Sequence, residues 1–182
     1  MKKHHLLLTV LSIAMLLLLS GCGPKGESVE SAVVEVAPAS PAGSFLLADI
    51  PPDAKDLLEG LASAAPEEPI LVKGRVGGTL EPLSSEFAGF VLSDEVIVFC
   101  DEMGKDGHCP TPWDACCEDP EKISASRAFV QFVNTEGFPL QVNLKEAIGL
   151  QENDAVIVKG YLSPDSTPDN RIIIAQGIAI GS

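Results

Sequence analysis

From residue 70 onward, the hydrophobic positions of this 182-residue chain follow the period of β-strands. Short segments rich in Val, Ile and Phe are separated by Gly, Pro, Asn and Asp, as is typical of strands joined by turns. The pattern predicts six strands, over residues 70–78, 87–92, 96–100, 128–133, 155–162 and 171–180. It also predicts a helical turn over 144–150, ended by Gly149, and a long loop between the third and fourth strands.

Residues 22–69 show no such sustained period. They are rich in Ala, Pro, Ser, Gly and Glu, which is typical of a flexible tether. Within them, Leu57, Leu58 and Leu61 form an apolar stripe that predicts a short helix over 53–64, either stable or transient within the tether. The sequence is thus divided into a tether, residues 22–69, and one β-domain, residues 70–182.

The N-terminal residues have the order of a bacterial export signal. Two lysines precede an apolar run over 6–19, which is shorter than the roughly 20 residues that a membrane span needs. The run ends in Leu-Ser-Gly-Cys22 and resembles the lipobox of bacterial lipoproteins. The resemblance implies that residues 1–21 are a signal peptide and that Cys22 carries acyl chains such as palmitate. It also implies an exported, lipid-anchored chain that faces the periplasm or the cell exterior, and Gly23 favours the outer membrane.

The mature chain is expected to be strongly acidic. Cleavage removes two lysines, which leaves ten basic against 26 acidic residues and a formal charge of −16. Nucleic-acid phosphates and anionic lipid surfaces require clustered Lys and Arg, so we expect no nucleic-acid partner and membrane attachment through the lipid alone. The charge is compatible with a solvated surface, with attraction of cations or with a basic partner.

Two segments of the β-domain share a form, since residues 70–76 and 156–162 each contain Val-Lys-Gly. The glycines predict a bulge or strong bend in the first strand, and the last strand ends in Ala-Gln-Gly-Ile-Ala-Ile. This order resembles bacterial exported OB-like domains, which are distantly similar to the anticodon-binding type. The resemblance implies a mainly all-β fold, a small OB-like Greek-key barrel with a long cysteine-rich loop, preceded by a flexible tether. An antiparallel sandwich is the alternative.

The long loop concentrates the remaining cysteines, which are Cys100, Cys109, Cys116 and Cys117. Its segment Thr-Pro-Trp-Asp-Ala-Cys-Cys, residues 111–117, resembles a group of bacterial secreted and lipoprotein domains with no assigned activity. The resemblance implies that the loop matters, but it supplies no chemistry.

Three interpretations of these cysteines remain open. An oxidising compartment favours two disulfides, pairing 100–116 with 109–117 or 100–117 with 109–116, because a bond between neighbouring residues is strained. A thiolate-bound metal ion is the second, although the spacing lacks the paired Cys-x2–4-Cys of zinc sites; Cu(I) or an iron–sulfur cluster is more compatible. Thiol redox exchange is the third, although the neighbouring acidic residues disfavour a thiolate.

Three further loop residues are candidates for binding, namely His108, Trp113 and Asp114. The alternative roles are structural: His108 is a solvated side chain, and Trp113 packs over the disulfides as a cap on the barrel. The acidic residues around them lack the spacing of a calcium loop.

The sequence contains no motif of a known catalytic centre, and His108 is the single histidine left after signal cleavage. We therefore expect no enzyme and no resident cofactor. The first hypothesis is a membrane-anchored binding module that holds a protein, peptide or glycan partner. The alternative is a metal-binding or thiol-redox lipoprotein that uses the four clustered cysteines.

Overall fold

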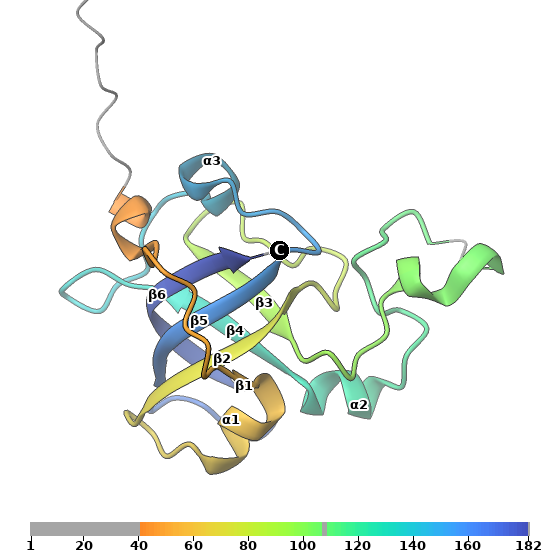
Figure 1. The fold of residues 1–182 in the computed structure, drawn as a ribbon, viewed down its shortest axis with the longest axis horizontal. Coiled ribbons are helices and arrows are strands. Elements are labelled where there is room, and N and C mark those ends of the chain that lie inside the picture. The colour runs from red at the N-terminus through yellow and green to blue at the C-terminus, as the bar shows by residue number, and fades with distance from the viewer. Residues whose placement is uncertain (1–40, 107–108, 182) are drawn as a thin grey trace, which may run out of the picture. The chain divides into compact units, whose positions relative to one another are not determined.

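The computed structural model describes residues 41–106 and 109–181, and five of its strands close into a small barrel (Figure 1). The barrel strands are β2 (Pro69–Val76), β3 (Gly89–Ser93), β4 (Arg127–Phe132), β5 (Ala155–Leu162) and β6 (Ile172–Gly181). They are ordered β2–β3–β4–β6–β5, and β5 pairs back onto β2. Neighbours are antiparallel except β4 and β6, which are parallel. This is an OB-like Greek-key barrel, so the predicted fold class is confirmed.

The two similar Val-Lys-Gly segments lie side by side where the barrel closes. Val72 is opposite Val158 across the β2–β5 pair, and both side chains are fully buried. The register irregularity lies in the β5–β6 pair, where Lys159 and Gly160 face Gly177 and Ala175, whereas the described pairings of the first strand show no bulge. A side chain at Gly160 would collide with the neighbouring strand, because its Cβ would lie 2.3 Å from the Ile174 carbonyl oxygen.

The barrel interior is filled by alternate side chains of these strands. The largest of its fully buried residues are Phe90, Leu92, Phe132, Ile173 and Ile178. The predicted helical turn is α3 (Leu144–Ile148), which follows Asn143 as N-cap and ends at left-handed Gly149. The prediction of this element is confirmed.

The predicted strand over 96–100 is wrong. Its alternation is real, because Ile97 and Phe99 are fully buried while Val96 and Val98 are exposed. No described strand pairs with it, however. The buried carboxylate of Asp94 instead accepts hydrogen bonds from the backbone N–H groups of Val96 and Leu58, at 3.0 and 2.8 Å, and so holds the turn that follows β3.

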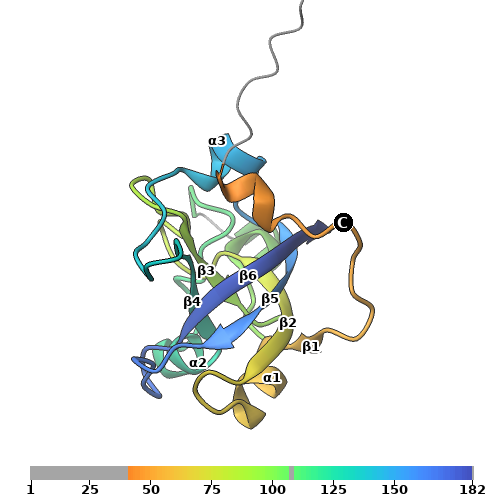
Figure 2. The same ribbon diagram turned by 90° about the vertical axis from the view of Figure 1, so that its left-hand side faces the viewer.

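Residues 41–69 are packed on the barrel, which corrects the prediction that the tether extends to residue 69. They form the 3-10 helix η1 (Pro41–Phe45), strand β1 (Lys55–Asp56) and helix α1 (Leu57–Ser63). The Phe45 ring meets Phe132 edge-on at 5.1 Å between centroids, and Leu57 is fully buried. Figure 2 shows η1 beside α3 at one end of the barrel and α1 at the other. The short helix that the leucine stripe predicted is present as α1, and its buried Leu57 and Leu61, together with Phe45, anchor this segment.

The signal peptide, Cys22 and the rest of the predicted tether lie outside the described residues. In the part of the chain that the structure describes, no helix has the length and apolar character needed to cross a membrane.

Candidate functional site

The long loop between β3 and β4 rests on a hydrophobic cluster of its own. Ile97, Phe99 and Ala115 are buried in this cluster, and Ile123 packs against them. The guanidinium carbon of Arg75, on β2, lies 4.0 Å from the centre of the Phe99 ring, which is cation–π geometry. The loop is therefore supported by packing of its own.

Trp113 attaches the loop to the connection between β2 and β3. Its indole N–H donates to the Leu80 carbonyl at 3.1 Å, and its own carbonyl accepts from the Gly78 N–H at 2.8 Å. At Gly77 an added Cβ would lie 2.4 Å from the Phe99 ring, so only glycine permits this close approach. Trp113 thus has a structural role, although it docks on this connection and not over disulfides.

Two backbone hydrogen bonds join the two sides of the loop. The Cys100 N–H donates to the Asp114 carbonyl at 2.8 Å, and the Asp101 N–H donates to the Pro112 carbonyl at 3.1 Å. Cys100, which begins the 3-10 helix η2 (Cys100–Asp106), is thereby held beside the segment that carries Cys116.

Three cysteine sulfurs meet at this place. The Sγ atoms of Cys109 and Cys116 are 2.9 Å apart, those of Cys100 and Cys116 are 3.5 Å apart, and the three lie within 4.8 Å of one another. A disulfide has a length near 2.05 Å, so neither predicted pairing is present among the described cysteines. Cys117 Sγ lies 3.8 Å from Cys116 Sγ but outside this group of three.

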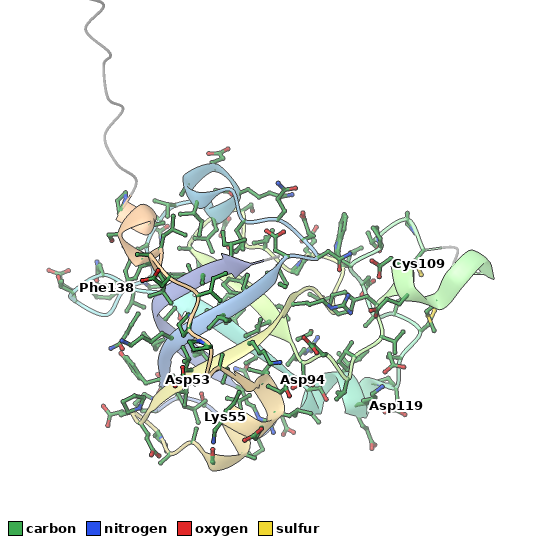
Figure 3. All side chains as sticks on the ribbon, viewed as in Figure 1. Asp53, Lys55, Asp94, Cys109, Asp119 and Phe138 are labelled. Atoms are coloured by element: carbon green, nitrogen blue, oxygen red, sulfur yellow. The ribbon has the colours of Figure 1, made fainter. Side chains whose placement is uncertain are left out.

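The site changes from buried to exposed across the group. Cys100 is buried, Cys109 is half-buried, and Cys116 and Cys117 are exposed. Figure 3 shows Cys109 on this outer loop, at the opposite side of the view from Phe138. The group of three is therefore anchored at its inner end and open to solvent at its outer end.

The neighbouring sulfurs control the ionisation of Cys109. Hydrogen bonds with Cys116 and Cys100, and to a smaller extent burial, raise the pKa of the Cys109 thiol well above its usual range. This thiol is protonated at neutral pH, so a cation must displace its proton in order to bind.

The carboxylates of the loop are engaged in holding the loop itself. Asp114 accepts from the Ala115 N–H, and Asp101 accepts from the Asn153 side-chain amide at 2.7 Å. Glu102 accepts from the Phe99 N–H and from Arg75, both at 2.8 Å. The predicted binding role of Asp114 thus has no support in its contacts, which are local.

Helix α2 (Pro120–Ala125) closes the loop and was missed by the hydrophobic pattern because it contains no periodic stripe. The Asp119 side chain caps it by accepting from the N–H groups of Glu121 and Lys122, at 2.8 and 3.1 Å. The signal was nevertheless present, since Asp-Pro-Glu is a typical helix start. Lys122 also pairs with Glu118, one turn earlier.

Comparison with models of known protein families finds no match, and comparison with curated proteins finds none either. The geometry of the loop brings Cys100, Cys109 and Cys116 together and leaves Cys117 beside them, whereas His108 lies outside the described residues.

Proposed function

We propose that this chain is a thiolate metal-binding module, built on an OB-like barrel and held at a bacterial membrane by lipid on Cys22. The observation that carries the proposal is the convergence of three unbonded sulfurs within 4.8 Å. Metal–sulfur bonds of about 2.3 Å place two ligand sulfurs about 3.8 Å apart in a tetrahedral site. The separations of 2.9 and 3.5 Å need only small side-chain rotations to reach that value.

The support beneath the sulfurs favours the same proposal. Binding sites work best when their ligands are held by packing and hydrogen bonds that exist before the ligand arrives. Here Phe99 and Ala115 pack below the site, and the Cys100 N–H is bound to the Asp114 carbonyl. The acidic charge of the chain adds a general attraction for cations.

The hypothesis of an interaction module for a protein, peptide or glycan stays a prediction. The most exposed large apolar side chains belong to separate segments of the described chain, and include Ile50, Leu80 and Phe138. No observation on these residues favours a partner, so the cysteine site carries the proposal.

Intact mass tests the proposed function directly. The mature chain, purified from its membrane in detergent without reductant, would be measured under native and denaturing conditions, before and after reduction. We expect extra native mass that is lost on denaturation, together with unmodified thiols at the four loop cysteines. A denatured mass about 2 Da lower for each disulfide, with no bound ion, would contradict the proposal.

A further inference from the structure

The number of sulfurs that converge gives information on the ion. Three sulfurs form the group, and the fourth cysteine is excluded from it even though its Sγ is 3.8 Å from that of Cys116. Cys117 directly follows Cys116 in the chain, and its sulfur approaches that of Cys116 while lying outside the mutual 4.8 Å group of the other three. The arrangement is a three-sulfur site with one further sulfur at its edge.

The chemistry of the donor atoms further narrows the choice of ion. Structural zinc sites use four protein ligands, and the carboxylates described around this loop are already engaged in hydrogen bonds. Soft thiolate ligands suit both Cu(I) and Zn(II), but Cu(I) has no requirement for a fourth ligand. Among the described residues the set consists of three sulfurs, and such a set matches a soft monovalent ion better than it matches Zn(II).

The exposure of the sulfurs indicates from which side an ion reaches the site. Cys100 is 5% exposed and is held by the backbone bond to Asp114, whereas Cys116 and Cys117 are exposed. An ion that arrives from solvent meets the outer sulfurs first. A separation of 3.8 Å between the Cys116 and Cys117 sulfurs is close to the distance between two sulfurs that share one ion.

We propose that Cys100, Cys109 and Cys116 bind Cu(I) with three sulfurs, and that Cys117 is the exchange ligand through which the ion enters and leaves. This inference rests on the proposed function. In the exchange step a copper–sulfur bond to Cys117 forms and the bond to Cys116 breaks. Copper stays Cu(I) throughout; the Cys117 thiol releases its proton to water as it binds, and the Cys116 thiolate takes up a proton from water as it is released.

The test separates equilibrium binding from exchange. The mature chain, kept reduced and free of oxygen, would be titrated with Cu(I) in competition with bicinchoninate, and separately with Zn(II) in competition with a chromophoric chelator. We expect one Cu(I) per chain and much weaker Zn(II) binding. Cys109→Ser should lower Cu(I) affinity by at least about 100-fold. Loss of a residue that only supports the ligands typically costs about 10–100-fold, and loss of a ligand should cost more.

Cys117→Ser tests the exchange role by itself, since it removes the neighbouring thiol that lies outside the group of three. It should keep Cu(I) affinity within about threefold, while release of the ion to excess bicinchoninate slows at least about tenfold. Fluorescence of Trp113, the single tryptophan, would report whether each variant keeps the loop docked. Cys116→Ser provides a second ligand variant if Cys109→Ser does not fold.

The outcomes distinguish this inference from the proposed function. If Zn(II) binds more tightly, or if Cys117→Ser loses as much affinity as Cys109→Ser, the metal-binding function stands and the three-sulfur Cu(I) site is wrong. If release is unchanged in Cys117→Ser, the exchange role is wrong. If the reduced wild-type chain binds neither ion, both proposals fail.

Discussion

At the scale of single residues, two glycines with the same backbone conformation have different surroundings. Gly78 has φ +81° and Gly137 has φ +86°, both in the left-handed region that favours glycine. A Cβ at Gly78 would lie 2.3 Å from Ser93 Oγ, which donates to the Gly77 carbonyl. A Cβ at Gly137 would meet nothing within 4 Å. The pair therefore separates backbone strain from collision.

We expect Gly137→Ala to cost about 1 kcal/mol of unfolding free energy, through backbone strain alone. Gly78→Ala should cost at least about 1 kcal/mol more, because the new methyl displaces Ser93 and disturbs the hydrogen bond from Gly78 to the Trp113 carbonyl. Denaturant unfolding followed by tryptophan fluorescence would measure both. Equal losses in the two variants would show that the loop does not depend on close approach at Gly78.

At the scale of elements, strands with a partner were predictable and the loop was not. The strand at Ala155–Leu162 is confirmed to the residue, because its alternation matches a paired strand. The same alternation at 96–100 predicted a strand that is absent. Ile97 and Phe99 are buried in a separate cluster, which no local pattern reveals. Likewise, the spacing of the cysteines could not tell which sulfurs meet, since a tertiary backbone contact to Asp114 positions Cys100.

One ion pair connects η2 to the barrel, and it makes the loop sensitive to pH. Burial opposes ionisation of Glu102, but the Phe99 N–H and the Arg75 guanidinium outweigh it and lower the pKa of this carboxyl. A carboxyl whose pKa is lower in the folded state stabilises the fold above its unfolded pKa of about 4.3. That stabilisation is lost as the pH falls through the lower, folded-state pKa.

We therefore expect Glu102→Gln to flatten the fall in unfolding free energy below about pH 4. At neutral pH the variant should be less stable than the wild type, and the difference should shrink at acid pH. Glu121→Gln, in α2, is the control, because it removes the same charge outside this ion pair. Equally flattened pH profiles in the two variants would assign the effect to net charge instead of to the Arg75 contact.

At the scale of the whole molecule, the extent of the folded unit decides how much chain stands between barrel and membrane. Phe45 packs on Phe132, the Leu47 N–H donates to the Ile178 carbonyl at 2.8 Å, and Leu57 is fully buried. These contacts make residues 41–64 part of the fold. If Cys22 is the lipid anchor, the segment between anchor and fold is then much shorter than the predicted tether.

Two shortened chains test this boundary. A chain of residues 41–182 should unfold with the same free energy as the full mature chain, because it keeps every contact described above. A chain of residues 65–182 should lose at least about 3 kcal/mol, since it removes the buried side chains of Leu57 and Leu61 and the ring of Phe45 from the barrel. Denaturant unfolding would measure both free energies. Equal free energies for the two shortened chains would show that residues 41–64 do not stabilise the fold and belong to the tether. The folded unit would then begin at β2.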